Sequence, residues 1–500
     1  MMDFFRNFPF FTIILAMVSG PVSSVLSGKK ARILSLCVVF SCTVLSAMTL
    51  IYTLGLEEPF VYTMGRFAAP FGNEIRAGVL EALMATFFCI IMFLSLTGGL
   101  KYLEKDVPEE KQNLYFIMIN LLLASLLALI YTNDLFTGYV FVEINTIAAA
   151  GLIMIRGWGR NILAAAKYMI MSLLGSGLLL VSISILYGIT GHLLMSNLHE
   201  SIAVIAENKT YIEPLIIAVG LFSVGLAIKS ALFPFHAWLP DAYGYSTCSS
   251  SAILSSLVSK GYIFLLIKFI YRVVGMDVFK MTGADDVLFL FGIAGMIIGS
   301  VDAIMQTDIS RMIAFSSVAQ IGYIYMGFGL GIEAGVVASV FHILAHASAK
   351  SMLFVSANGL AEVSGDSMNY RDLRGSGIRN PSAGIGFLAG SLSMVGIPLF
   401  AGFTSKVYFA QAALLEAGNA KKIITLIALA VSTVLNAVYF IRMSISVYTP
   451  RMNAQYEDRS FRAGKAYSVS IILFIVIVLI LGILSNPIFD WISLGLKQFS

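Results

Sequence analysis

The chain has 500 residues, of which 58% are hydrophobic and only 12% are charged. Soluble domains carry about 25% charged residues, so this composition excludes an ordinary soluble protein and predicts a membrane protein with many spans. The net charge of +4 is too small to indicate a nucleic-acid partner. The four cysteines form no CxxC pair and no metal-ligand spacing. We therefore expect no metal site, Fe–S cluster or other bound cofactor in this chain.

Runs of about 20 apolar residues predict transmembrane helices, because the bilayer core is about 30 Å thick and a helix rises about 1.5 Å per residue. About fourteen such runs occur: 8–26, 33–54, 76–99, 113–131, 133–155, 162–188, 212–233, 245–272, 286–305, 310–331, 335–360, 383–416, 420–448 and 466–489. The first run lacks a small-residue cleavage site, so we expect it to be retained. The predicted fold is an all-α polytopic membrane protein.

Lysine and arginine in the short loops predict the orientation, because cytoplasmic loops carry an excess of both. One set of alternate loops is rich in them: Lys29, Lys30, Arg32, Lys101, Lys105, Lys111, Arg156, Arg160, Arg371, Arg374, Arg379, Arg451, Arg459, Arg462 and Lys465. The opposite set holds fewer: Arg66, Arg76, Lys209, Lys280, Lys421 and Lys422. We therefore expect the first set in the cytoplasm and both termini outside, which requires an even number of spans.

Two spans that lie five apart are interrupted by proline or glycine. The seventh, GLFSVGLAIKSALFPFHAWLPDA, breaks at Pro234, and the twelfth, SLSMVGIPLFAGFTSKVYFAQAALL, breaks at Gly396 and Pro398. Each carries a lysine near its break, Lys229 or Lys406. This spacing predicts two five-helix repeats, spans 4–8 and 9–13, the second inverted in the membrane because each repeat has an odd number of spans.

The repeats predict four segments along the chain. These are an N-terminal three-helix segment (1–110), a first five-helix repeat (111–275), a second, inverted five-helix repeat (276–448), and a cytoplasmic loop with the C-terminal helix (449–500). In transporters built from inverted repeats, broken helices mark the ion site. We therefore expect the functional residues near the two breaks.

Ionisable residues inside spans are functional candidates, because each costs at least ~2.5–3.5 kcal/mol at a helix centre. Seven are the main candidates: Glu143, Lys229, Lys260, His342, His346, Lys350 and Lys406. His342, His346 and Lys350 are spaced i, i+4, i+8, so they share one helix face along about 12 Å. A single histidine there is more often a packing residue, but three titratable groups in register favour a hydrated conduit.

Lysine is a suitable proton carrier, since burial disfavours its charged form while a nearby carboxylate favours it. Moving that carboxylate closer or further away loads or unloads a proton. Glu143 is the acid found mid-span among these lysines, so Glu143 and Lys229 form the candidate switching pair. The alternative is a static buried ion pair.

Other charged residues are weaker candidates. The secondary candidates are Lys167, His236 and Asp241. His236 and Asp241 follow the seventh-span break, and we expect them to face a cytoplasmic vestibule. Lys101, Lys268 and Arg272 lie near span ends, where long side chains commonly reach the membrane surface, and we expect the same of them.

The motifs around these residues resemble the antiporter-like subunits of respiratory complex I, Mrp-type sodium/proton antiporters and membrane-bound hydrogenases. The resemblance covers roughly residues 75–445. NDLFTGYVFVE ends in the family's key glutamate, here Glu143, and IKSALFPFHAWLPDA places its paired lysine at Lys229. HILAHASAKSMLF and GIPLFAGFTSKVYF place later lysines at Lys350 and Lys406.

The resemblance implies fourteen helices, an inverted repeat, and proton passage through Glu–Lys pairs, lysines, histidines and water. Lys260 would be the central connector and Lys406 the terminal lysine near one exit. After LPDA this chain reads YGYSTCSSSAILSS, where the family usually has a proline-rich segment. The chain also lacks the long lateral helix of the largest members, so it resembles the shorter, inner or middle type of subunit, in the inner membrane of a prokaryote.

Three functions remain open at this point. The leading one is a proton-translocating subunit of a complex-I-related redox-driven pump of the NADH or ferredoxin dehydrogenase or hydrogenase type, without redox chemistry of its own. Its partners would be other antiporter-like and small membrane subunits and a peripheral arm of Fe–S proteins, with Na⁺ as a second candidate ion. The alternative is a subunit of an Mrp-type secondary antiporter, without redox partners. A structural subunit with an inactive channel is the third.

Overall fold

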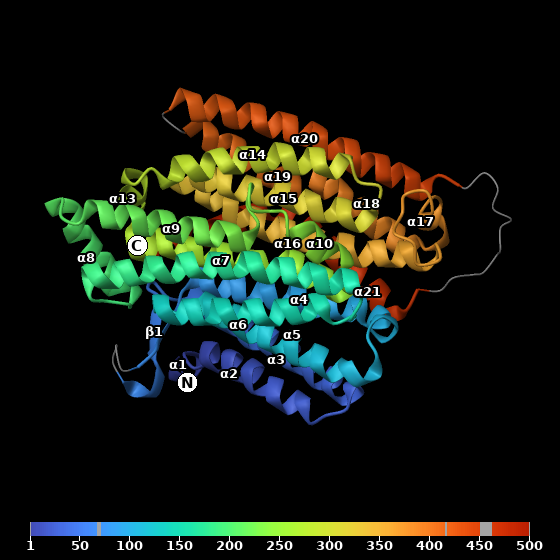
Figure 1. Ribbon diagram of the computed structural model, residues 1–500, viewed down its shortest axis with the longest axis horizontal. Coiled ribbons are helices and arrows are strands. Elements are labelled where there is room, and N and C mark those ends of the chain that lie inside the picture. Colours follow the sequence, from blue (N-terminus) through green and yellow to red (C-terminus); the bar gives the residue numbers. More distant parts are fainter. Residues whose placement is uncertain (1, 68–71, 416–417, 451–462, 500) are drawn as a thin grey trace.

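Long helices cross one bundle from end to end and lie roughly side by side (Figure 1). The computed structural model describes residues 2–67, 72–415, 418–450 and 463–499. Within these ranges, 12 helices are long and apolar enough to cross a membrane. Two shorter apolar helices lie where the first and twelfth spans are predicted. The expected all-α polytopic membrane fold with about fourteen spans is therefore confirmed.

The helices that form the spans agree in position with the apolar runs. They are α2 (Phe8–Ser24), α3 (Gly28–Leu54), α4 (Val79–Asp106), α5 (Glu109–Tyr131), α6 (Leu135–Met154), α7 (Gly159–Thr190), α9 (Ile212–Ser230), α14 (Ala284–Ile304), α15 (Ile309–Gly329), α16 (Glu333–Glu362), α18 (Pro381–Val395), α20 (Asn419–Tyr448) and α21 (Lys465–Ile483). The eighth span is a composite helix of α11 (Cys248–Ile253), the π-helix η2 (Leu254–Val258), α12 (Ser259–Lys268) and the π-helix η3 (Phe269–Val274). Beyond a break, α18 continues as α19 (Ala401–Leu415).

Hydropathy does not predict several short elements between the spans. They are α1 (Met2–Phe5), β1 (Phe60–Thr63), η1 (Met64–Arg66), β2 (Glu74–Ala77), α8 (Met195–Asn208), α10 (Leu239–Tyr245), α13 (Met276–Met281), α17 (Ser376–Arg379) and α22 (Ser485–Lys497). β1 and β2 form an antiparallel pair. The last predicted span, 466–489, is too long, because α21 ends at Ile483 and the amphipathic α22 then packs against α4.

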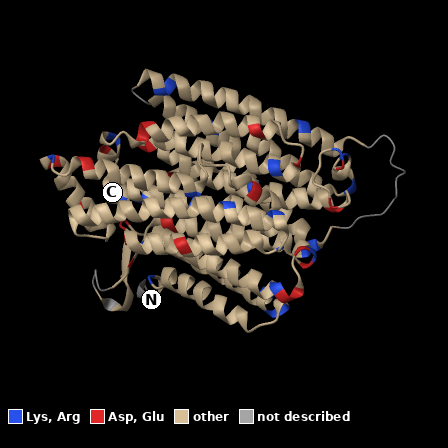
Figure 2. Cartoon of the chain, viewed as in Figure 1, with Lys and Arg blue, Asp and Glu red and all other residues tan. Residues whose placement is uncertain are grey.

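Both termini lie at the same end of the bundle, as an even number of spans requires (Figure 1). Figure 2 shows charged residues gathered at the two ends, with a smaller number between them. The two sets of loops distinguished by their lysine and arginine content occupy opposite ends. Arg451, Arg459 and Arg462 of the richer set lie outside the described residues.

The two predicted repeats begin at opposite ends of the bundle. α5 starts at the end where Lys105 pairs with Asp366 after α16. α14 starts at the other end, where Lys421 pairs with Asp285 at 2.9 Å. In the first run α7 packs on α9, which precedes one break, and in the second α16 packs on α18 and α19, which flank the other. Two runs of helices thus cross the bundle in opposite directions, while the segment boundaries at 110, 275 and 448 stay predictions.

The second helix of each run starts with the same local signal. Asp134 accepts a hydrogen bond from the Thr137 backbone N–H at 2.6 Å and caps α6. Asp308 accepts one from the Arg311 backbone N–H at 2.9 Å and caps α15. An aspartate at this position satisfies one of the N–H groups that a helix start leaves without an intrahelical partner.

Lys268 and Arg272 do not reach the membrane surface, so the expectation from their position near a span end is wrong for both. Their exposed fractions are 0% and 3%, because η3 and the end of α12 lie inside the bundle. Arg272 forms an ion pair with Glu81 of α4, whose side chain is also buried. Lys101 is different, since its side chain is 47% exposed in a pair with Glu362.

The ammonium group of the buried Lys268 is bonded to backbone oxygens in place of water. Its ammonium donates to the carbonyls of Leu129 and Ile130 at 3.1 Å each and also to that of Thr132. These carbonyls belong to the C-terminal end of α5, which has no helical N–H partners left for them. The lysine therefore caps α5 from the interior, and a cation is favoured there by the helix dipole.

We expect Glu81→Gln to destabilise the protein by ~3–5 kcal/mol, because it leaves the buried Arg272 guanidinium without a counter-charge. Lys105→Ala is the control: its pair with Asp366 is exposed at both side chains, 61% and 59%, so the cost should be about 0–1 kcal/mol. The midpoint of thermal unfolding in detergent measures both. Equal shifts in the two variants would mean that the Glu81–Arg272 pair adds no more than a surface pair.

Candidate functional site

The seven ionisable residues predicted within spans form a series that runs through the middle of the bundle. We call this series the ionisable line: Glu143 on α6, Lys229 on α9, Lys260 on α12, His342, His346 and Lys350 on α16, and Lys406 on α19. It draws on both runs of helices. Lys260, Lys350 and both histidines are at most 1% exposed.

The predicted pair Glu143 and Lys229 is in contact. Lys229 Nζ lies 3.3 Å from Glu143 Oε1 and donates to Thr146 Oγ1 at 2.9 Å. The lysine side chain is fully buried, whereas that of the glutamate is 27% exposed. Thr146 follows Glu143 by three residues on α6, so one helix face offers the ammonium both a carboxylate and a hydroxyl.

Glu143 has a second partner on the neighbouring helix. The Ser176 hydroxyl of α7 donates to the same oxygen, Glu143 Oε1, that faces Lys229. One carboxylate oxygen thus accepts from Ser176 and contacts Lys229 at the same time, while Thr146 gives the ammonium a further, neutral ligand. The contact at 3.3 Å is long for a charge-assisted hydrogen bond.

A group of aromatic and amide side chains extends from this pair, and the sequence reasoning missed it. Tyr262 donates to Asn145 Oδ1 at 3.0 Å and lies 3.3 Å from Thr146 Oγ1 and 3.5 Å from the Tyr168 hydroxyl. Lys229 Nζ is 5.6 Å from the centre of the Tyr262 ring. Tyr262 lies on α12, the helix that also carries Lys260, so this group joins α6 and α7 to that helix. The asparagine and threonine of EINT, directly after the key acid, were the available signal.

The remaining lysines are held by backbone oxygens. Lys260 donates to the carbonyl of Ser255 in the π-helix η2. Lys350 donates to the carbonyl of Ile313 at 2.7 Å and to the hydroxyl of Ser316, both on α15. A π-turn shifts the helical hydrogen-bond pattern and is common at functional sites, which here gives an inner lysine an oxygen ligand.

Lys406 uses the break between α18 and α19. Its ammonium donates to the carbonyl of Val395 at 2.6 Å and to that of Met394 at 3.3 Å. α18 ends at Val395, and Gly396 follows with φ = +92°. Ending the helix removes the N–H partners of these carbonyls, so the break itself supplies the ligands of the lysine.

His342, His346 and Lys350 share one face of α16, as their spacing predicts. The two imidazole rings are 6.1 Å apart and nearly parallel, at 4°. His342 Nδ1 lies 2.6 Å from the hydroxyl of Ser405, the residue before Lys406. His342 also stacks against Tyr323 of α15, with ring centres 5.4 Å apart. The stripe on α16 thus reaches the terminal lysine of α19.

Charge interactions run along the same direction. Lys260 and Lys350 act electrostatically on His346, and Lys260 and Lys406 act on His342. The pair of histidines is therefore within range of the charges of both the central lysine and the terminal one. Charge interactions thus extend from Lys260 to Lys406, and Tyr262, on the same helix as Lys260, lies beside the Thr146 ligand of Lys229.

The secondary candidates belong to a different place. Asp241 on α10 pairs with Lys167 at 2.7 Å and with Arg311 at 2.8 Å. His236 Nε2 lies 3.8 Å from Asp302 Oδ2. These charges join the start of α15 to α7 and α10 near one end of the bundle, and the structure does not bring them into the ionisable line.

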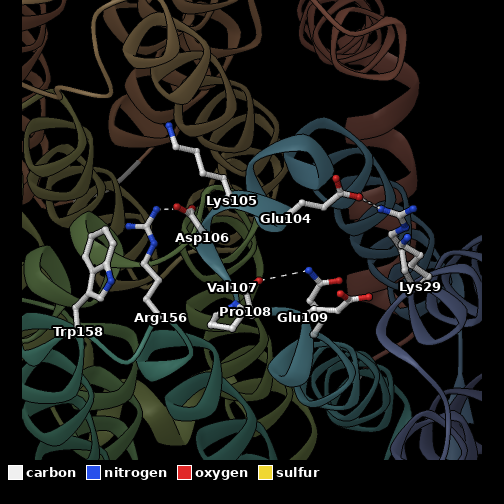
Figure 3. A pocket seen from close by; sticks show the side chains of 11 residues that line it. Lys29, Glu104, Lys105, Asp106, Val107, Pro108, Glu109, Arg156 and Trp158 are labelled. Atoms are coloured by element: carbon white, nitrogen blue, oxygen red, sulfur yellow. Dashed lines mark hydrogen bonds and ion pairs between the residues drawn. The ribbon is translucent and has the colours of Figure 1, made fainter.

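A surface cavity of about 770 Å³ lies at the same end of the bundle and is lined mainly by charged and polar residues. It is lined by Lys29, Arg32, Glu104, Lys105, Asp106, Val107, Pro108, Glu109, Gln112, Arg156 and Trp158. Figure 3 shows Arg156 extending to Asp106, with Trp158 beside it. Among the described residues, no three His, Cys, Asp or Glu side chains form a group that could hold a metal ion. The chemistry that the ionisable line offers is proton exchange among amines, imidazoles and the carboxylate of Glu143.

The sequence matches a family model and several known proteins over most of its length. The family model described as "NADH:quinone oxidoreductase/Mrp antiporter, TM" matches residues 132–436. An N-type subunit of the NADH-quinone oxidoreductase of Desulforudis audaxviator is 34% identical over 405 residues, covering 80% of this chain and 78% of that protein. A D-type subunit of the Na⁺/H⁺ antiporter of Alkalihalophilus pseudofirmus is 27% identical over 434 residues, covering 86% and 84%.

Solved structures share the fold over nearly the whole length. A chain of an archaeal membrane-bound sulfane sulfur reductase superimposes with a TM-score of 0.86 at 23% identity, covering 100% of this chain and 97% of that one. A chain of the Mrp complex from Dietzia superimposes with a TM-score of 0.87 at 21% identity, covering 99% and 97%.

Proposed function

The chain belongs to the NADH:quinone oxidoreductase/Mrp antiporter transmembrane family, and from this premise we propose that it is a proton-translocating, antiporter-like membrane subunit of a complex-I-related redox-driven pump. The observation that carries the proposal is the ionisable line, in which Glu143 contacts Lys229 and buried lysines and histidines continue to Lys406. Buried ionisable groups of this kind mark proton relays in membrane proteins.

The switching step takes place at Glu143 and Lys229. With the carboxylate beside it, the lysine is favoured as an ammonium. When Glu143 moves away from Lys229, the lysine keeps only the neutral Thr146 hydroxyl, and its proton passes to a neutral acceptor in the direction of Tyr262 and Lys260. Lys229 is then a neutral amine, and the return of Glu143 favours uptake of the next proton.

Beyond Lys260 the proton passes along α16 by the two histidines to Lys406. Each buried ammonium has carbonyl or hydroxyl ligands, which stabilise the charge only partly and leave the group free to lose its proton. Lys406 is more exposed than the other lysines of the line and is the terminal group. Lys350 lies beside His346 and adjusts its charge.

The proposed partners are other antiporter-like and small membrane subunits, because the relatives are subunits of multi-subunit complexes. In a redox-driven complex, Fe–S proteins of a peripheral arm would supply the driving force, and no cofactor is assigned to this chain. H⁺ is the proposed ion, and Na⁺ is a second candidate. The excess of Lys and Arg at one end favours that end as cytoplasmic and both termini as external, in a prokaryotic inner membrane. Labelling of a cysteine placed at Lys209 from the outside checks this orientation.

The alternative is a subunit of an Mrp-type secondary antiporter, which the likeness to the Na⁺/H⁺ antiporter of Alkalihalophilus pseudofirmus favours. Gentle purification in detergent, with mass spectrometry of the partners and iron analysis, separates the two. We expect stoichiometric Fe–S iron together with redox partners. An iron-free preparation with small membrane subunits alone would replace the redox-driven pump by the antiporter.

We expect Glu143→Gln and Lys229→Ala each to abolish proton translocation by the complex in vesicles, because either change removes one charge of the switching pair. The internal pH of the vesicles, followed with a pH-sensitive dye, measures this. Lys167→Ala is the matched control, since Asp241 keeps its contact with Arg311. Pumping at the normal rate by either pair variant would refute the assignment, and loss of the assembled complex would favour a structural pair, the third function considered.

We expect Gly396→Ala to reduce translocation, because a Cβ there would lie 3.0–3.4 Å from three atoms of the Lys406 side chain and displace its ammonium from Val395. Gly191→Ala is the control for backbone strain, since Gly191 has φ = +74° and no atom within 4 Å of its Cβ position. Initial rates of vesicle acidification compare the two. Equal rates would mean that the ligands of Lys406 at the break do not contribute to transport.

A further inference from the structure

Helices α15 and α16 run antiparallel and pack against each other along the ionisable line. Two contacts fix how their faces align. Near one end of the contact, Lys350 of α16 donates to Ser316 of α15. Near the other, His342 of α16 stacks against Tyr323 of α15.

This alignment brings Gln320 opposite His346. On α16, His346 lies four residues from both His342 and Lys350. On α15, Gln320 lies four residues after Ser316 and three before Tyr323, so it shares their face. The position halfway between the two contacts is occupied by Gln320 on α15 and by His346 on α16. These two residues therefore face each other.

These two side chains have the same unusual property. Both are 0% exposed. Neither the amide oxygen and nitrogen of Gln320 nor the two ring nitrogens of His346 have a hydrogen-bond partner among the described residues. A buried polar group without a partner costs about 1–3 kcal/mol. Such groups are normally bonded to ordered water, which binds where two to four polar atoms converge.

We propose that Gln320 and His346 bind ordered water between them, and that Gln320 is the positioning residue that fixes which nitrogen of His346 carries the proton. This inference rests on the proposed function. A glutamine amide offers an acceptor and two donors, and water offers both, so together they can satisfy one N–H and one bare nitrogen of a neutral imidazole. The partner of one ring nitrogen determines the tautomer at the other.

A fixed tautomer of His346 sets the direction in which a proton passes through its ring. A proton from the Lys260 ammonium enters through water at the bare nitrogen, which leaves a neutral amine and an imidazolium. The proton on the opposite nitrogen then leaves toward His342, and His346 is neutral again with its tautomer reversed. Exchange through the water held by Gln320 restores the starting tautomer. Without the amide and the water, either nitrogen could carry the proton. Uptake at one nitrogen and release from the other would then no longer follow a fixed sequence.

The first test observes the site itself in the assembled complex. A cryo-electron microscopy map that resolves ordered water should show density between the Gln320 amide and the His346 ring. The chain has five histidines, so ¹⁵N-histidine labelling and magnetic resonance of the complex can isolate the His346 signals as those lost in His346→Phe. We expect one neutral tautomer. A dry contact, or an even mixture of tautomers, would overturn the inference.

The second test uses Gln320→Leu, which removes the amide at similar volume. We expect the tautomer preference to be lost and the initial rate of proton translocation to fall about tenfold, since a buried hydrogen-bonded partner of the relay is gone. Gln320→Asn keeps the amide and leaves room for one more water, so it should retain the tautomer and most of the rate. Asn120→Leu is the matched control, because it removes a buried amide that bonds to Ser23 of α2, away from the ionisable line.

The outcomes separate this inference from the proposed function. If Lys229→Ala abolishes translocation but Gln320→Leu pumps normally with an unchanged His346 spectrum, Gln320 is only a packing residue. If Lys229→Ala pumps normally, the proposed function itself fails. Should Gln320→Leu not assemble, the map and Gln320→Asn still decide, because loss of the His346 tautomer in the Asn variant would contradict the assigned role of the amide.

Discussion

The interior of this bundle must hold ammonium groups where no lipid and little water can solvate them. An unpaired charge taken out of water costs several kcal/mol, so each buried lysine needs oxygen ligands supplied by the protein. For Lys406 and Lys260 the chain meets this requirement by interrupting a regular helix, whereas Lys350 uses the Ile313 carbonyl and the Ser316 hydroxyl of α15. The break after α18 exposes the carbonyls that hold Lys406, and the π-helix η2 supplies the one that holds Lys260. The irregular backbone is thus needed to provide carbonyl ligands for two of the buried lysines.

The same constraint explains why two runs of helices with opposite direction build one line. Each run contributes one broken helix with a lysine of the line near the break, Lys229 on α9 and Lys406 on α19. Packing of α16 against α11 and η2 of the composite helix brings the histidines of the second run within range of the charge of Lys260. The line therefore depends on the interface between the runs as much as on the residues within them.

Hydropathy predicted the fourteen spans and their order, because about 20 apolar residues are a strong signal. It also predicted the seven residues of the ionisable line, because charge in an apolar run stands out. It did not predict the ligands: Thr146, Ser316 and the carbonyl of Val395 are ordinary polar groups until the tertiary fold aligns them. Lys268 and Arg272 were misjudged for a related reason, since distance from a span end says nothing about which helices are interior. The amphipathic α8 and α22 lie between spans, where no apolar run marks them.

Two ion pairs among the described residues, Glu81–Arg272 and Glu143–Lys229, differ in a way that matches different tasks. Arg272 contacts Glu81 while its guanidinium stacks on Phe499 at 4.0 Å, and Glu81 also accepts from the Gly78 N–H at 3.1 Å. Arginine stays charged under all ordinary conditions, so such a pair can only hold helices together. Lys229 instead lies 3.3 Å from Glu143, and each group has a further hydroxyl partner, Thr146 for the lysine and Ser176 for the glutamate. Lysine loses its proton readily when buried. The choice of arginine for the tight pair and lysine for the loose one therefore separates a structural contact from a proton-transfer site within the same interior.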